Sequence, residues 1–243
     1  MGVPTAGQVD TTPAVVDGTV YVGGFEGPLY ALNAAEGTER WRYDIRDYSF
    51  VPTVAGDTVY VPDSIGNIAA LAAGDGSERW MAEVGEVDAK AVAVDDDAVY
   101  VGIDTSGNDN LIALDRTDGS RRWTFRAESD PLAECDRDTE FCFDAIRTTP
   151  TVHDVTVYVG TNDGWVVAVD ATEGTERWRA TTAESVLASL AVAAGTVCAA
   201  RADGGSYALA TPDGAQRWRT QLAEGLNAEP AGRGGTAFVG GLY

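Results

Sequence analysis

The sequence contains few of the residues that most enzyme sites need. It holds one histidine and three cysteines among 243 residues. The single histidine, His153, falls in a predicted turn, and no second histidine is present for a Ser-His-Asp triad or a His-rich metal site. No Cys-x-x-Cys pair offers a zinc site, and neither a Walker A loop nor a Rossmann fingerprint occurs. The sequence therefore predicts no catalytic residue and favours a protein that is not an enzyme.

Basic residues are also scarce. Lysine and arginine total 17 against 38 aspartates and glutamates, which gives a formal net charge of -21, and Lys90 is the only lysine. Such a charge disfavours binding to nucleic acid. High acidity with almost no lysine resembles the proteins of extreme halophiles, in which molar salt shortens the Debye length to about 3 Å and screens the repulsion between carboxylates. We expect the fold to lose stability at low salt.

Long apolar runs are missing as well. No run reaches the ~18 apolar residues of a membrane span, so we expect no insertion into a membrane. No charged start followed by an apolar stretch lies near Met1, which predicts no signal peptide in the chain as given. Two localisations stay open: cytoplasmic if Met1 is the true start, and exported or at the cell surface if the chain is mature or truncated.

What the sequence does contain is an internal repeat. The pattern Gly-x-x-Arg-Trp occurs five times, ending at Trp41, Trp80, Trp123, Trp178 and Trp218. Upstream of each copy lies a strand-like triplet, which begins at Val20, Val59, Val99, Val157 and Val197, and a sixth begins at Ala237. A unit of about 40 residues is therefore repeated along the chain.

Each unit contains four short strand-like runs separated by turn residues. In the first unit they are Thr12 to Val16, Thr19 to Gly23, Leu29 to Asn33 and Glu39 to Asp44. Four strands per repeat predict an all-β fold, a β-propeller with four-stranded blades, five complete and a sixth partial. We expect one domain, 1–243, with blades at approximately 12–48, 52–85, 89–128, 148–183, 187–222 and 227–243 (partial), and an insertion at 128–147.

The turn before each tryptophan is an acidic residue followed by glycine, as in Glu36-Gly37 and Asp75-Gly76. Glycine there supplies the positive φ that closes a tight hairpin. The tryptophan can then lay its indole against the adjacent blade, where truncation to alanine would cost about 3–5 kcal/mol. We therefore interpret Trp41, Trp80, Trp123, Trp178 and Trp218 as structural docking residues, since a ligand site needs asymmetry and these positions are alike.

The segment from Ala168 to Trp178, Ala-Val-Asp-Ala-Thr-Glu-Gly-Thr-Glu-Arg-Trp, resembles the tryptophan-docking repeat of PQQ-like β-propellers. That superfamily includes quinoprotein alcohol dehydrogenases and, without any quinone, the BamB-like lipoprotein scaffold of the outer-membrane assembly machinery. The resemblance extends from about Thr12 to Tyr243 and is specific for the fold, whereas one fold hosts many functions. The WD40 signatures, Trp-Asp and Gly-His, are missing.

The number of blades leaves two arrangements open. The sixth repeat stops at Tyr243, where its third strand would begin, and Met1 to Asp10 could supply one strand to it. The chain is then either a small, imperfectly closed six-bladed ring or part of a larger propeller. Ring closure would need a partner or the missing blades, because an open blade exposes an unpaired edge.

Residues that break the repeat symmetry are the candidates for binding. In a propeller the insertion and the loops between second and third strands lie on one face, and Trp165 begins a strand at that rim. We predict a protein-interaction face at this rim, with an aromatic anchor beside an adaptable loop. Its predicted members are Trp165, Asp163, Asn162, Asp63 and Asp203.

Two basic residues, Lys90 and Arg147, align with the start of innermost strands, which should surround the central channel. They could hold an anionic ligand there, or form salt bridges to Asp10 or Glu229. The resemblance implies that a dehydrogenase would carry pyrroloquinoline quinone (PQQ) and calcium over this channel, covered by a disulfide between adjacent cysteines. No Cys-Cys pair occurs in this chain. We therefore expect no cofactor, with PQQ and calcium as the alternative.

Two further features lead to hypotheses about a metal site and a disulfide. The loop from Asp104 to Asn110 is rich in oxygen ligands and could bind calcium through Asp104, Asn108 and Asp109, although it lacks the spacing of an EF-hand. Cys135 and Cys142 lie within the insertion, where a disulfide would stabilise the fold by about 2–3 kcal/mol and would fit an oxidising compartment. Two free thiols in the same loop are the alternative.

Three functions follow from these observations. The first is a non-catalytic scaffold that binds a protein partner through the loop-rich face. The second is a PQQ- and calcium-dependent alcohol or sugar dehydrogenase, or a fragment of one. The third is the sensor domain of a larger receptor or kinase.

Overall fold

The structure of the chain is a computed structural model. It describes residues 11–24, 27–45, 49–85, 91–103, 110–127, 146, 148–161, 163–182, 186, 189–200, 204–221, 231–233 and 236–238. These residues form strands, turns and bends without a helix, so the prediction of an all-β fold is confirmed. Within the same ranges, no helix is long and apolar enough to span a membrane.

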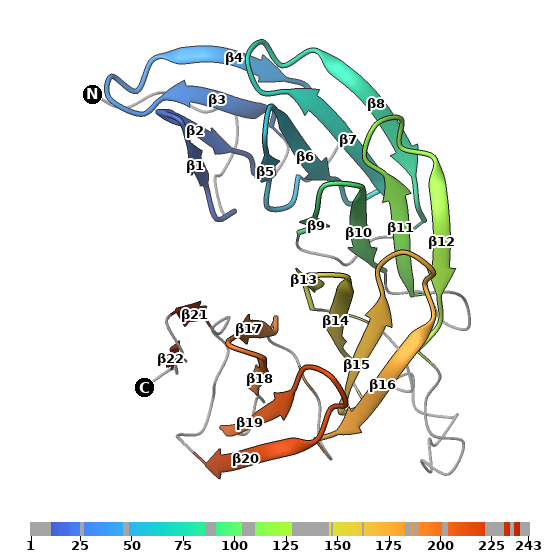
Figure 1. The fold of residues 1–243 in the computed structure, drawn as a ribbon. Helices are drawn as coiled ribbons and strands as arrows, with labels where there is room; N and C mark the ends of the chain where they lie inside the picture. Colours follow the sequence, from blue (N-terminus) through green and yellow to red (C-terminus); the bar gives the residue numbers. More distant parts are fainter. Residues whose placement is uncertain are drawn as a thin grey trace, which may run out of the picture. The chain divides into compact units, whose positions relative to one another are not determined.

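Five sheets of four strands follow one another along the chain, and in each sheet the strands are neighbours in sequence order (Figure 1). The first holds β1 (Ala14–Val16), β2 (Thr19–Val22), β3 (Leu29–Asn33) and β4 (Glu39–Tyr43), and the second holds β5 (Thr53–Ala55), β6 (Thr58–Pro62), β7 (Asn67–Ala72) and β8 (Glu78–Glu83). The third holds β9 (Ala93–Val94), β10 (Ala98–Gly102), β11 (Leu111–Asp115) and β12 (Arg121–Phe125). The fourth holds β13 (Thr151–His153), β14 (Thr156–Gly160), β15 (Trp165–Asp170) and β16 (Glu176–Thr181), and the fifth holds β17 (Ala191–Ala193), β18 (Thr196–Ala200), β19 (Gly205–Ala210) and β20 (Gln216–Gln221).

Beyond the fifth sheet, β21 (Ala231–Arg233) and β22 (Thr236–Phe238) form an antiparallel pair. Both strands contact β17, the first strand of the fifth sheet. The sequence predicts a partial sixth blade in this region. The β21–β22 pair is the part of that region that the structure describes.

In the second, third and fourth sheets the second strand is buried along its length. Every residue of β6, β10 and β14 is buried, including Tyr60, Tyr100 and Tyr158 of the Val-Tyr-Val triplets. A strand with continuous rather than alternating apolar character is typical of a sheet covered on both faces. The repeated triplets therefore form the core of the sheets.

An alanine lies directly opposite the tryptophan in the third and fourth strands. Ala31 pairs with Trp41 and Ala70 with Trp80, and the same pairing occurs in the fourth and fifth sheets. In each of these sheets the register shifts by one residue immediately after this alanine. These alanines are fully buried, and a small side chain there leaves room for the indole on the same face of the sheet.

The chain divides into two compact units. The first consists of 1–99 and 114–122, and the second of 100–113 and 123–243, so that the boundary passes through the third sheet.

Candidate functional site

Four of the five repeated tryptophans pack against a glycine in the following sheet. The indole of Trp41 lies on the β7–β8 turn, where its Nε1 donates to the carbonyl of Ala73 at 2.9 Å. A Cβ atom at Gly76 of that turn would lie 2.6 Å from Cε3 of Trp41. The same pairing recurs for Trp80 with Gly119, Trp123 with Gly174 and Trp178 with Gly214. The turn glycine is therefore required for two reasons. Its backbone has a positive φ, and the indole from the sheet before it occupies the space that a side chain would fill.

The remaining residues of the repeat hold this tryptophan in place. Tyr21 lies beside Trp41 with ring centroids 5.7 Å apart, and the equivalent pairs are 5.8 Å apart: Tyr60 with Trp80, Tyr100 with Trp123 and Tyr158 with Trp178. The arginine before Trp41 donates to Thr19 Oγ1 at 2.8 Å. Equivalent bonds join Arg79 to Thr58, Arg177 to Thr156 and Arg217 to Thr196. The repeated motif thus builds rigid sheets and leaves binding to residues that differ between sheets.

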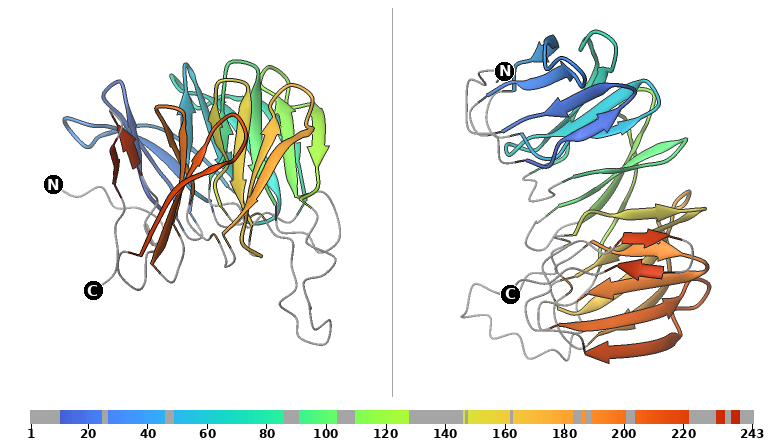
Figure 2. Two further views of the ribbon diagram at one scale, coloured as in Figure 1. Left: turned by 60° about the horizontal axis from the view of Figure 1, so that its bottom comes forward. Right: turned by 90° about the vertical axis from the view of Figure 1, so that its left-hand side faces the viewer.

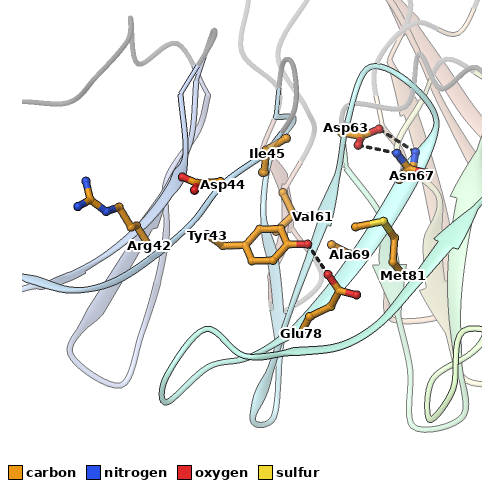
Figure 3. A pocket seen from close by; sticks show the side chains of 10 residues that line it. All are labelled: Arg42, Tyr43, Asp44, Ile45, Val61, Asp63, Asn67, Ala69, Glu78 and Met81. Carbon is orange, nitrogen blue, oxygen red and sulfur yellow. Dashed lines mark hydrogen bonds between the residues drawn. The ribbon is translucent and has the colours of Figure 1, made fainter.

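A groove between the first and second sheets is such a place. It has a volume of about 550 Å³ and is lined by Arg42, Tyr43, Asp44, Ile45, Val61, Asp63, Asn67, Ala69, Glu78 and Met81 (Figure 3). Its volume lies within the range of about 300–1,000 Å³ that is typical of ligand sites. The buried side chains of Val61 and Ala69 belong to the core between the two sheets, whereas Met81 is 49% exposed. The groove therefore has a buried, apolar floor and a rim that is accessible to solvent.

Ala69 is the smallest side chain that lines the groove. Each repeat has an alanine that is aligned with its tryptophan, and one residue comes directly before that alanine. In the order of the five sheets, this residue is Tyr30, Ala69, Ile112, Val167 and Tyr207. Only the second sheet carries alanine there, so its third strand has no large side chain at the level of the groove. Comparison of the repeats could have identified this position from the sequence, and our sequence analysis missed it together with Tyr43, Glu78 and Met81.

The charges around the groove are mostly acidic. The Tyr43 hydroxyl donates to Glu78 Oε2 at 2.5 Å, and Asp44 lies beside it (Figure 3). Arg42 also lines the groove (Figure 3), and its Nε lies 3.6 Å from a carboxylate oxygen of Glu39. The rim therefore presents carboxylates next to an apolar floor.

Asp63, predicted as part of an interaction face, borders this groove but serves its own turn. It is buried, and its Oδ1 accepts from the backbone N–H groups of Ile65 and Asn67 at 3.1 and 2.7 Å. Its Oδ2 accepts from the Asn67 side-chain amide at 2.9 Å (Figure 3). These bonds occupy both carboxylate oxygens, and they fix the β6–β7 turn that forms one end of the groove.

Trp165 and Asp163, two other predicted members of that face, lie in the fourth sheet. The Arg179 guanidinium stands 5.8 Å from the Trp165 ring centroid and is ion-paired with Glu176 on the same strand. Trp165 is half-buried. The Asp163 carboxylate accepts from the Thr161 hydroxyl, which itself accepts from the Trp165 backbone N–H at 3.0 Å. The indole is therefore partly covered by an arginine of its own sheet.

The other predicted site residues lie outside the described residues. They are Lys90, Arg147, Asp104, Asn108, Asp109, Asn162, Asp203, Cys135 and Cys142. Trp218 is described and is 45% exposed. Within the described ranges, no group of three His, Cys, Asp or Glu side chains is placed to hold a metal ion.

Comparison with known proteins identifies the repeat. The family model described as outer membrane protein assembly factor BamB matches residues 3–107, 64–164 and 113–242. The serine/threonine-protein kinase AfsK of Streptomyces griseus is 30% identical over 186 residues, which is 76% of this chain and 17% of the kinase. This chain thus spans about a sixth of that relative's length.

Solved structures show the same fold. BamB from Moraxella catarrhalis has a TM-score of 0.77 at 24% identity, over 96% of this chain and 71% of that chain. Quinohemoprotein alcohol dehydrogenase from Comamonas testosteroni has a TM-score of 0.71 at 19% identity, over 90% of this chain and 44% of that chain. Because the family model matches along almost the whole sequence and the sheets repeat the tryptophan-docking contact, the chain belongs to the PQQ-like β-propeller repeat family.

Proposed function

We propose that the chain is a non-catalytic β-propeller scaffold that binds a segment of a partner protein in the groove between its first two sheets. The observation that carries this proposal is the groove itself, with its apolar floor and accessible, acidic rim. The match to a family named after an assembly factor supports a role in binding proteins. A rigid scaffold of repeated sheets that binds its partner through the residues that differ between repeats is a common design for recognition.

The chemistry of the groove indicates the kind of segment that fits. The floor at Val61 and Ala69 would receive an apolar side chain, whose burial contributes about 25 cal/mol per Å². The carboxylates of Asp44 and Glu78 at the rim would attract a lysine or arginine next to it. We therefore expect a partner segment that combines one apolar residue with one or two basic residues.

The interaction face predicted from the sequence remains a second contact within this proposal. It comprises Trp165, Asp163, Asn162, Asp63 and Asp203 with the insertion at 128–147. Deletion of 132–143 is expected to weaken partner binding with little change in the melting temperature, because the sheets supply the stability.

The decisive variant is Ala69→Tyr. Tyrosine occurs naturally at the equivalent position in the first and fifth sheets, as Tyr30 and Tyr207, so the strand accepts it. In the second sheet it would fill the groove. Val155→Tyr is the matched control, since Val155 is 55% exposed in a turn of the fourth sheet and borders no part of the groove.

A random twelve-residue peptide library would be selected against the wild-type protein in molar KCl, and the enriched peptides measured by calorimetry. We expect basic-apolar peptides that bind the wild type and Val155→Tyr equally and bind Ala69→Tyr at least tenfold more weakly, a loss of about 1.4 kcal/mol or more. Equal binding to Ala69→Tyr, with its melting temperature preserved, would remove the groove from the proposal.

A second candidate function rests on the similarity to AfsK. As the sensor domain of a receptor or kinase, the chain would form a small part of a longer protein, as its 17% share of AfsK illustrates. Determining the coding sequence on both sides of these residues tests this candidate, because a sensor must be joined to the domain that it controls. The dehydrogenase alternative is supported by the fold that this chain shares with the quinohemoprotein, and stabilisation of the chain by PQQ with calcium would test it.

A further inference from the structure

In three of the five sheets, an arginine of the fourth strand lies directly opposite a larger residue of the third strand. The pairs are Tyr30 with Arg42, Val167 with Arg179 and Tyr207 with Arg219. In the second sheet the same positions hold Ala69 and Met81, and both of these side chains line the groove. The second sheet therefore lacks both the larger residue and the cation of this pair.

The fifth sheet shows how the pair fills the space between two sheets. The Arg219 guanidinium, on the edge strand β20 (Figure 2), lies 5.2 Å from the centroid of the Tyr207 ring. Tyr207 is 3% exposed and belongs to the core between the fourth and fifth sheets, and its hydroxyl donates to the Thr182 carbonyl at 2.9 Å. An arginine over an aromatic face is attracted by the ring and covers it with its own stem. The aromatic side chain is thus buried, and the arginine closes the space above it.

The fourth sheet shows how a glutamate holds this arginine. Trp165 lies two residues before Val167 and so on the same face of the sheet, and the Arg179 guanidinium lies 5.8 Å from its ring centroid. The Arg179 Nε also donates to Glu176 Oε1 at 2.8 Å. Glu39 and Arg42 of the first sheet have the same three-residue spacing and form the same ion pair. An aromatic ring, an arginine and a glutamate therefore act together.

Glu78 is the equivalent glutamate of the second sheet, but the residue three positions after it is Met81. Its Oε2 accepts from the Tyr43 hydroxyl of the first sheet at 2.5 Å instead. Tyr43 occupies the position that Ala180 has in the fourth sheet, and the groove of about 550 Å³ remains beside it. The groove thus has the acidic member of the group, whereas its own sheet supplies neither the aromatic ring nor the arginine.

We propose that the partner segment supplies these two groups: an aromatic side chain that enters the groove beside Ala69, and an arginine that covers the ring and pairs with Glu78. This inference rests on the proposed function and names the residues that the partner carries. Met81 suits an aromatic ring, because a thioether packs favourably against the ring edge. Arginine is required rather than lysine, because its planar guanidinium stacks on a ring while it binds a carboxylate.

The spacing of the two partner residues follows from the geometry of an extended chain. Side chains two residues apart point to the same side of such a segment, so that both can face the groove. The pattern that fits is therefore Trp-x-Arg or Tyr-x-Arg. Two positive charges are not needed, since one arginine satisfies Glu78.

The probe is the peptide Gly-Ser-Trp-Ser-Arg-Ser-Gly, with 5-fluorotryptophan as its aromatic residue, added to the full chain in molar KCl. We expect its fluorine resonance to shift and saturate. A peptide with leucine and lysine at the two positions is measured by its displacement of the fluorinated peptide. It should bind at least ~tenfold more weakly, because it has neither the ring nor the guanidinium.

Met81→Arg tests the role of Glu78 from the protein side. It places the arginine of the other sheets three residues after Glu78, and Met81 is 49% exposed, so the strand accepts it. The fluorinated peptide should bind this variant about fivefold more weakly, since its own arginine must compete for the carboxylate. Met81→Leu is the matched control and should bind the peptide like the wild type.

Three results would overturn the inference: a fluorine resonance that does not move, equal binding of the leucine–lysine peptide, or equal binding to Met81→Arg. The library peptides of the proposed function separate the two failures. If they bind the wild type but not Ala69→Tyr while the probe gives one of these results, the groove is a binding site and the aromatic–arginine pair is wrong. If the library peptides also bind Ala69→Tyr equally, the groove itself fails.

Discussion

Gly119→Ala tests the physical account of how the sheets dock. Gly119 has a φ of +74°, and a Cβ there would lie 2.6 Å from Cε3 of Trp80. Real Cβ atoms do not approach ring carbons so closely, and both the ring and the turn backbone are held. The Trp80 indole donates to the Arg116 carbonyl at 3.0 Å, which resists a shift of the ring. The substitution must therefore separate the second and third sheets locally.

The expected cost has two parts. An L-residue at positive φ costs about 1–2 kcal/mol. Overpacking against the indole adds about 1–3 kcal/mol. Gly18→Ala separates these parts, because Gly18 has a φ of +69° and no atom lies within 4 Å of its Cβ position. The two variants share the backbone strain, and only Gly119→Ala meets the indole.

The assay is urea and thermal unfolding of both variants in molar KCl. We expect Gly119→Ala to lose about 1–3 kcal/mol more than Gly18→Ala, which lowers its melting midpoint by a further ~2–4 °C per kcal/mol for a chain of this size. Equal losses in the two variants would refute the reasoning, since they would show that the turn glycine is needed for its backbone conformation alone.

Three further predictions concern salt, pH and cofactor. With a net charge of -21, the melting midpoint should fall steadily on dialysis from molar KCl to low salt, and a midpoint insensitive to salt would contradict the halophilic interpretation. Hydrogen bonds from Arg177 hold the pKa of Asp170 below its ordinary value of 3.8, so this group stabilises the fold fully above that value and the contribution is lost as the pH falls through the folded-state pKa. Urea unfolding between pH 7 and pH 3 should therefore show a smaller acid loss for Asp170→Asn than for the wild type. PQQ with calcium should leave the melting midpoint unchanged, whereas saturation at 100 times Kd would add about 2.7 kcal/mol and favour the dehydrogenase alternative, with Lys90 and Arg147 as the residues to mutate.

The sequence predicted the all-β fold because its repeat carries local signals. A Val-Tyr-Val triplet between turn residues specifies a buried strand, and an acidic-Gly pair specifies the hairpin that follows. Four of the five copies carry this triplet and all five carry the acidic-Gly pair, so an ambiguous strand in one repeat is resolved by the others. The five four-stranded sheets follow from this agreement.

The sequence predicted that each repeated tryptophan lies against the adjacent blade, but it did not identify the residue that the indole meets there. Gly76 has a reason of its own in its turn conformation, and the indole of Trp41 that lies on it comes from another sheet. Asp63 was predicted at an interaction face because its loop shares that face with the insertion, and the sequence did not indicate that both of its carboxylate oxygens accept hydrogen bonds from its own turn. The groove is lined by a small apolar residue, Ala69, which stands out only when the equivalent positions of the five repeats are compared.

The most direct test of the proposed function uses a probe that the sequence provides. The chain has two methionines, Met1 and Met81, and Met81 lies at the rim of the groove. Protein labelled with ¹³C at the methionine methyl groups would be titrated with the tightest peptide from the library selection. The account predicts that the Met81 signal shifts and saturates with the calorimetric Kd while the Met1 signal stays in place. A peptide that binds by calorimetry and leaves the Met81 signal unmoved would contradict it.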